Sequence, residues 1–103
     1  MEGSVIKGIW DTRQVFINGV ELLPAASLKL KNHSPDGFAW GYGGSGPAQL
    51  ALAILLRFCT KEIALSFHQQ FKWVVIAALP SGDFELPVEA VKNWIENNVE
   101  GEE

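Results

Sequence analysis

The sequence predicts an α+β fold, in which a small antiparallel sheet of N-terminal strands and a hairpin packs against about three C-terminal helices. Segments with alternating apolar residues lie before residue 43, whereas helical apolar spacing begins after residue 47. Strands first and helices afterwards are typical of α+β domains, whose helices cover one face of an antiparallel sheet. Because 103 residues with 48% hydrophobic side chains can form one core, we expect a single domain over residues 1–99.

The clearest strand signal is a β-hairpin at Asn18-Gly19, since both positions of a two-residue turn need positive φ. A first strand is expected within residues 4–10. Two further strands are expected over residues 27–31 and 38–42, where apolar residues alternate with polar or small ones. The hairpin turn would place four apolar side chains on one face, pairing Ile17 with Val20 and Val15 with Leu22.

A central helix is expected after the glycine-rich loop of residues 43–46. Pro47 suits the first helical position with Gly46 as the cap, which places Gln49 where its side chain can reach back to that cap. Residues 50–58 are apolar almost all round, so this helix should lie at the centre of the core.

Two more helices and a tail complete the predicted chain. The spacing of apolar residues predicts a second helix over residues 61–79, and Pro87 can open a third. Residues 100–103 are expected to form a disordered acidic tail. The inward face of the last helix would carry Val88, Val91, Ile95 and Trp94.

The charge distribution argues against binding nucleic acid. The net charge is −4, and residues 83–103 hold seven acids against one base, leaving a net of +2 on residues 1–82. Broad electrostatic binding to nucleic acid needs clustered lysine and arginine. The single cysteine, Cys59, excludes an intrachain disulfide. No secretion signal and no apolar run of membrane-spanning length is present, so we expect a cytoplasmic protein without membrane contact.

The glycine-rich loop is the first candidate site. Gly41, Gly43 and Gly46 match the G-x-G-x-x-G pattern of dinucleotide-binding folds, but no parallel strand follows, and no Lys-Ser/Thr pair completes a P-loop. Backbone N–H groups of Gly43, Gly44, Ser45 and the helix start could hold an anion. The alternative is that these glycines only turn the chain and let helix and sheet pack closely.

Other residues near this loop have side chains that could take part in chemistry or binding. His33 lies beside a Pro-Gly turn and suits a base, a ligand or a backbone hydrogen bond, whereas His68 is expected to face solvent. Two histidines without clustered carboxylates or cysteines predict no metal site. Ser45 lies in Gly44-Ser45-Gly46, which departs from the nucleophile-elbow pattern at its last position. Trp40 and Tyr42 either line the core or present rings that stack a base or bind a peptide.

A long motif carries a family resemblance. Asn32 through Leu55 reads Asn-His-Ser-Pro-x-Gly-Phe-x-Trp-Gly-Tyr-x-Gly-Ser-Gly-Pro-Ala-Gln-Leu-Ala-Leu-Ala-Ile-Leu, and it is continued by Phe71-Lys72, Val75-Ile76 and Leu79-Pro80. This run resembles a family of small uncharacterised domains of unknown function found in prokaryotes, phages and other mobile elements. The resemblance implies a stand-alone accessory domain, and it assigns neither an activity nor catalytic residues.

These observations favour a small non-enzymatic binding protein without a cofactor, which binds a protein partner or a small anionic ligand such as a nucleotide. Two alternatives stay open. One is a hydrolase or transferase that uses Ser45 or His33, and the other is a homodimer formed through a sheet edge or through Trp73 and Trp94. The candidate ligand-binding residues are His33, Trp40, Tyr42, Gly43, Gly44, Ser45, Gly46 and Gln49.

Overall fold

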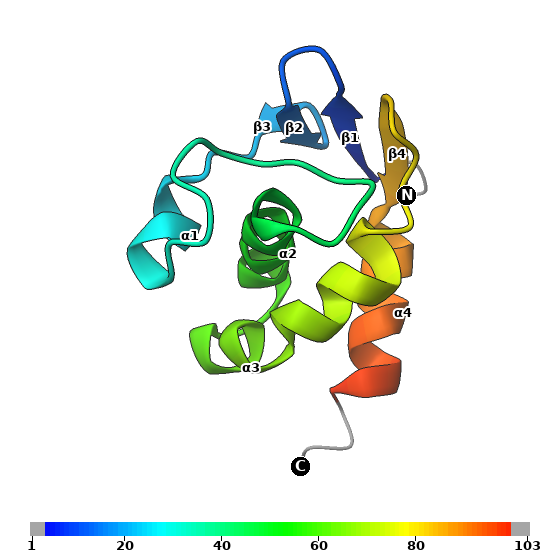
Figure 1. The fold of residues 1–103 in the computed structure, drawn as a ribbon. Coiled ribbons are helices and arrows are strands. Elements are labelled where there is room, and N and C mark those ends of the chain that lie inside the picture. Colours follow the sequence, from blue (N-terminus) through cyan, green and yellow to red (C-terminus); the bar gives the residue numbers. More distant parts are fainter. Residues whose placement is uncertain (1–3, 100–103) are drawn as a thin grey trace.

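A four-stranded antiparallel sheet and the helices on one of its faces form the α+β fold that the sequence predicts. The computed structural model describes residues 4–99 (Figure 1). The sheet order is β3-β2-β1-β4, so the last strand pairs with the first. The strands are β1 (Val5–Ile9), β2 (Gln14–Ile17), β3 (Val20–Glu21) and β4 (Phe84–Pro87).

The predicted hairpin is confirmed. Asn18 and Gly19 both have positive φ, 51° and 83°, as a tight hairpin turn requires. Ile17 pairs with Val20, and the Leu22 N–H donates to the Val15 carbonyl at 2.7 Å. Val15, Ile17 and Leu22 are buried beneath the helices, whereas Val20 at the turn is exposed.

The strand expected over residues 27–31 is wrong, because α1 (Ala25–Leu30) occupies this segment. Pro24 caps the helix, and the buried Ser27 hydroxyl donates to the Pro24 carbonyl at 2.9 Å. Alternation over five residues is also compatible with one helical turn. The alanine, leucine and lysine of this segment are good helix formers, which favours a helix over a strand.

The strand expected over residues 38–42 is also wrong. Within residues 4–99 the segment pairs with no strand, and Gly41 has a φ of 86° that interrupts an extended ladder. Instead, the Trp40 indole N–H donates to the Gly82 carbonyl at 2.8 Å, and the Gly41 N–H donates to the Ile76 carbonyl at 3.1 Å. The alternation reflects the burial of Phe38 and Trp40 in the core, but the segment takes part in no sheet pairing.

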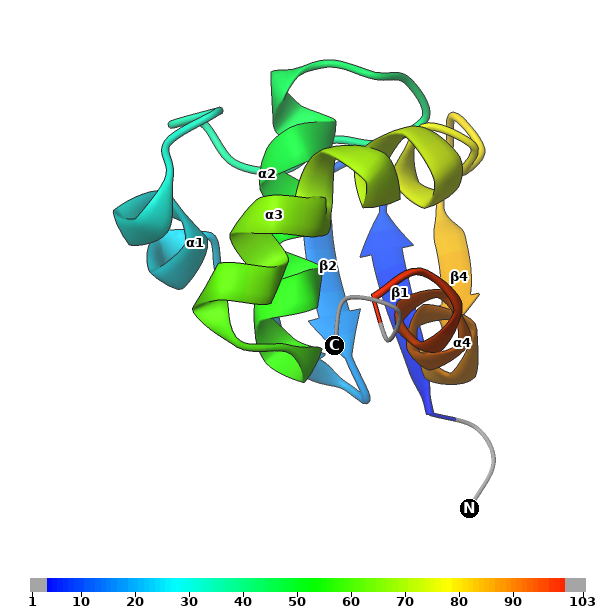
Figure 2. The ribbon, with the colours of Figure 1, turned by 90° about the horizontal axis from the view of Figure 1, so that it is seen from below.

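The central helix, α2 (Ser45–Phe58), lies between the sheet and α3 (Lys61–Phe71), as Figures 1 and 2 show from two directions. Residues 46–55 are buried without exception, because apolar neighbours cover the helix on both sides. The predicted cap is wrong by two residues. Gly44 is the cap and Ser45 the first helical residue, so Pro47 occupies the third position.

The break predicted between the helices is confirmed at Thr60, whose hydroxyl accepts a hydrogen bond from the Ile63 N–H at 3.2 Å. After α3 the chain widens into one π-helical turn, η1 (Lys72–Ile76), closed by a bond from the Ala77 N–H to the Lys72 carbonyl at 2.8 Å. π turns inside helices are frequent at functional sites.

The last helix, α4 (Val88–Asn98), buries the face that the sequence predicts, with Val88, Val91 and Trp94 in the core and Ile95 packed against it. Trp94 meets Phe71 edge to face at 5.1 Å between ring centroids. The acidic tail predicted over residues 100–103 lies outside the described residues. Among residues 4–99, no helix is both long and apolar enough to cross a membrane.

The contact between Gly8 and Phe84 gives a test of the packing between β1 and β4. A Cβ at Gly8 would overlap the Phe84 ring, which is held in the core against Trp40 at 4.8 Å between centroids. Overpacking of this kind costs about 1–3 kcal/mol, so Gly8→Ala should lower the free energy of unfolding by that amount in urea denaturation. Gly82→Ala, with nothing within 4 Å of its Cβ position, is the matched control. Equal stability of the two variants would contradict this packing.

Candidate functional site

Gln49 connects three segments at the centre of the molecule. Its side chain is fully buried in α2. The amide oxygen accepts hydrogen bonds from the backbone N–H groups of His33 at 2.7 Å and Ser34 at 3.0 Å. The amide nitrogen donates to the Ser27 hydroxyl at 2.9 Å and to the Lys31 carbonyl at 3.1 Å. The side chain therefore uses its full hydrogen-bonding capacity to tie α1 and the turn that follows it to α2.

The prediction that Gln49 reaches back to the helix cap is therefore wrong. Because α2 begins at Ser45, Gln49 lies in the second turn, beyond reach of the first N–H groups. Its role is to hold the backbone of His33, and it is not accessible to a ligand.

His33 and His68 contact each other directly, with 2.9 Å between their Nε2 atoms. The Nδ1 atom of His68 lies 2.9 Å and 3.1 Å from the carbonyl oxygens of Leu65 and Ala64. Carbonyl oxygens only accept, so Nδ1 of His68 carries the proton and its Nε2 has a free lone pair in the neutral ring. The Nε2–H group of His33 then donates to His68, which fixes the tautomers of both rings.

The prediction that His68 faces solvent is wrong, since the side chain is only 3% exposed. The polar neighbours Gln69 and Gln70 suggested a solvated face, and both are indeed exposed. However, Ala64, His68 and Phe71 follow one another at helical spacing on the buried face of α3. This spacing was the signal that could have placed His68 correctly.

Two lysines, Lys31 and Lys72, lie close enough to the histidine pair to affect its pKa values. Burial lowers the pKa of His33 below its ordinary value, and His68, Lys31 and Lys72 lower it further. Burial also lowers the pKa of His68, as do Lys31 and Lys72, against the opposing effect of its carbonyl hydrogen bonds. Both rings are therefore neutral near pH 7. We call Lys31, His33, His68 and Lys72 the basic cluster.

Lys72 is the least ordinary member of this cluster. Its side chain is 8% exposed, yet its ammonium group makes neither a hydrogen bond nor an ion pair with any residue from 4 to 99. The ammonium nitrogen lies 4.4 Å from the centroid of the Trp73 ring. No buried side-chain nitrogen of the described residues lacks a hydrogen-bond partner, so the ammonium reaches solvent beside Trp73 while its aliphatic stem is buried. An ammonium without an acidic partner at the surface is a candidate for binding an anion.

The glycine-rich loop lies against two exposed aromatic rings. A Cβ at Gly43 would overlap the Trp73 ring, and a Cβ at Gly44 would overlap the Tyr42 ring. Trp73 and Tyr42 are nevertheless 61% and 54% exposed. The glycines therefore allow the rings to pack directly on the loop backbone, which places Trp73 beside the start of α2.

The first turn of α2 offers unpaired donors at this place. The N–H groups of Ser45 and Gly46 precede the first carbonyl that could accept from them within the helix. Neither donates to another residue that the structure describes, and Ser45 is exposed, whereas Gly46 is buried against Ala39. We call the surface formed by Tyr42, Gly43, Gly44, Ser45, Gly46, Lys72 and Trp73 the glycine-loop site.

Of the eight residues predicted for ligand binding, the structure brings Tyr42 and residues 43–46 together at this site. His33 lies in the adjoining basic cluster, Gln49 is structural, and Trp40 is fully buried in the core. Sequence reasoning missed Lys72 and Trp73. They lie far along the chain, and only the packing of α3 and η1 beside α2 brings them to the loop.

The contacts do not assemble a nucleophile and base. Within residues 4–99, no hydrogen bond joins Ser45 to a histidine, and no carboxylate accepts from His33 or His68. A Ser–His pair needs hydrogen-bond reach and an orienting group to activate the hydroxyl. Nor does a third histidine, cysteine or carboxylate join the pair in this part of the chain to make a metal site.

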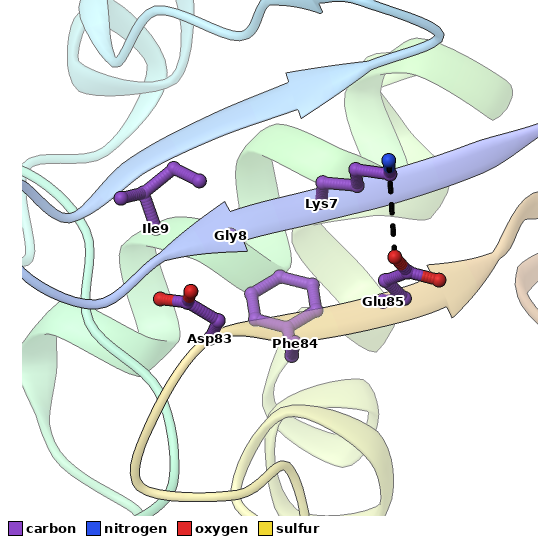
Figure 3. A pocket seen from close by; sticks show the side chains of 6 residues that line it. All are labelled: Lys7, Gly8, Ile9, Asp83, Phe84 and Glu85. Carbon is purple, nitrogen blue, oxygen red and sulfur yellow. Dashed lines mark ion pairs between the residues drawn. The ribbon is translucent and has the colours of Figure 1, made fainter.

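The other hollows of the described residues offer less chemistry. A depression of about 400 Å³ on the outer face of the sheet lies beside Lys7, Asp83 and Glu85 (Figure 3). Its Lys7–Glu85 ion pair spans 3.8 Å, but both side chains are more than half exposed. Exposed pairs of this kind contribute little energy, and the depression contains no buried polar group that needs a ligand.

Comparison with known proteins identifies the family. A family described as "Family of unknown function (DUF6166)" matches residues 7–97. The chain belongs to this family. The match confirms the resemblance to an uncharacterised domain family and extends from β1 to α4, well beyond residues 20–80. No curated protein and no solved structure shows a significant match.

The hydrogen bonds of Gln49 predict a large effect of its loss in this DUF6166 member. Gln49→Leu would leave the N–H groups of His33 and Ser34 and the Lys31 carbonyl without their partner. A buried group left unsatisfied costs about 1–3 kcal/mol, and because these hydrogen bonds are part-buried, we expect a total loss of about 1–3 kcal/mol in urea denaturation. Gln70→Leu, at an exposed position of α3, is the control. A loss of under about 1 kcal/mol for Gln49→Leu would show that these bonds do not hold the turn.

The histidine pair predicts a pH dependence of stability. Because folding lowers both pKa values from the ordinary 6.5, the stabilisation is complete above that pH and is lost as the pH falls through the lowered values. The melting temperature should therefore decrease as the pH is lowered from about 7.5 to about 5. The melting temperature should depend less steeply on pH in the double variant His33→Gln/His68→Gln, which retains all carboxylates. Parallel slopes in the two proteins would assign the pH dependence to groups other than this pair.

Proposed function

We propose that this protein is a non-enzymatic binding module for a small anionic ligand and that the glycine-loop site binds it. The observation that carries the proposal is the Lys72 ammonium, which has no acidic partner among the described residues and packs on Trp73, the ring that lies against Gly43. The unpaired N–H groups at the start of α2, which form the positive end of the helix dipole, add favourable potential beside this ring. Both features favour a negative charge there.

A small ligand fits this site better than a nucleic acid does. The whole chain has a net charge of −4, and Lys72 with Lys31 supplies the permanent positive charge of the basic cluster. Polymer binding releases many counterions and needs many cations along a surface. A single phosphate or carboxylate needs one ammonium group and a few N–H donors.

A protein partner is the second candidate. Tyr42, Trp73 and Val74 are large apolar residues that are more than half exposed, and aromatic residues are enriched at the centres of protein interfaces. The predicted homodimer remains a prediction, and of its two tryptophans only Trp73 is exposed, because Trp94 packs against Phe71. An association with phages or other mobile elements likewise remains a prediction.

Titration with inorganic phosphate tests the proposal. A ligand that binds only the native state raises the melting temperature with concentration. Loss of a charge-assisted hydrogen bond weakens binding by about 10- to 100-fold, so Lys72→Met should reduce the phosphate-induced shift accordingly. Lys92→Met, at an exposed position of α4, should bind phosphate as the unaltered protein does. The same shift in all three proteins, or no shift in any, would contradict the proposal.

A further inference from the structure

A hollow between α1 and α2 shares no residue with the glycine-loop site. Its volume is about 460 Å³, and it is lined by Ala26, Lys29, Leu30, Leu56 and Lys61. The first three of these residues lie on one face of α1, because they are three and four positions apart. Leu56 comes from α2, and Lys61 is the first residue of α3. Three helices therefore build this hollow.

The apolar part of the lining is aliphatic. Leu30 and Leu56 are half-buried and pack against the core, and Ala26 is exposed. An alkyl chain that covers these side chains removes apolar surface from water, which is favourable. No aromatic ring and no acidic or amide side chain lines the hollow. The lining therefore suits an alkyl chain and lacks the aromatic faces on which a base stacks.

The charged part of the lining is entirely positive. Lys29 and Lys61 are exposed, and Glu62, which follows Lys61 in the chain, does not line the hollow. Neither lysine forms an ion pair with an acidic residue in the part of the chain that the structure describes. The stem of a lysine packs along apolar surface while its ammonium group stays in water. Two cations thus border an aliphatic surface, which is complementary to an anion with an alkyl chain.

The size of the hollow favours a small ligand over a protein partner. A stable protein interface involves about 20–30 residues on each side, whereas five residues line this hollow. Pockets for small molecules have volumes of about 300–1,000 Å³ and mostly apolar linings with a few polar groups. The volume of about 460 Å³ falls within that range. One small amphiphilic molecule therefore matches the hollow in size, in apolar surface and in charge.

We infer that the hollow between α1 and α2 binds a fatty acid. The alkyl chain lies on Ala26, Leu30 and Leu56, and the carboxylate lies at the ammonium groups of Lys29 and Lys61. This inference goes beyond the proposed function, because the ligand and the residues that bind it are different from those of the glycine-loop site.

Titration of the isotope-labelled whole protein with octanoate, 1-octanol and acetate tests the inference. Octanoate should cause saturable shifts of the backbone N–H signals of Ala26, Leu30 and Leu56. It should bind at least about tenfold more tightly than acetate, which lacks the chain. It should bind about threefold more tightly than 1-octanol, which lacks the charge. Added salt should reduce the difference between octanoate and 1-octanol, because salt screens exposed charges.

Two variants separate the contributions of charge and chain. The double variant Lys29→Gln/Lys61→Gln should bind octanoate only as tightly as 1-octanol, whereas Lys92→Gln, at an exposed lysine of α4, should bind it as the unaltered protein does. Ala26→Leu fills the hollow and should weaken the binding of both octanoate and 1-octanol. Ala90→Leu, at an exposed alanine of α4, is its control. Circular dichroism of each variant confirms that it is folded.

Three results would overturn the inference. Equal affinity for octanoate and 1-octanol in the unaltered protein would show that the lysines do not select a carboxylate. Unchanged octanoate binding by Ala26→Leu would place the chain elsewhere. Shifts in the hollow that appear with vesicles of anionic lipid, but not with octanoate, would assign this surface to a membrane. The proposed function is tested separately, because phosphate binding at the glycine-loop site does not depend on these residues.

Discussion

The four hydrogen bonds of the buried Gln49 amide are the constraint on which the arrangement around the site depends. A fully buried amide is costly unless each donor and acceptor is satisfied, so α1 and the turn at His33 must lie where Gln49 can reach them. That placement puts the His33 ring against His68 on α3. Residues from the turn after α1, from α3 and from η1 are thereby brought into one basic cluster.

Close packing on the glycine loop is the second constraint. Gly43 and Gly44 carry no side chain, so the rings of Trp73 and Tyr42 lie on the backbone itself. The π-helical turn η1 then lets Lys72 point inward and Trp73 outward at neighbouring positions. The structural and the functional interpretations of the glycines are therefore compatible, because the packing they permit creates the surface that we propose as a binding site.

The sequence predicted the elements that depend on local chemistry. The Asn18-Gly19 turn and the apolar face of α4 each follow from residues close in the chain, and both are confirmed. Alternation over residues 27–31 and 38–42 predicted strands that do not form, because alternation reflects burial on one side and a strand also needs a partner. The sequence singled out the glycine-rich loop. The positions of Lys72 and Trp73 beside it, and the burial of His68, depend on packing between distant segments, which spacing in one sequence does not reveal.

The central claim is that the start of α2, with Lys72 and Trp73, forms a binding site for a small anionic ligand. Mapping backbone and indole N–H chemical shifts of the isotope-labelled protein during titration with inorganic phosphate tests this claim most directly. The account predicts the largest, saturable shifts at residues 43–46 and at the Trp73 indole. Saturable shifts confined to the hollow between α1 and α2, lined by Ala26, Leu30 and Leu56, or no saturable shift at all, would contradict it.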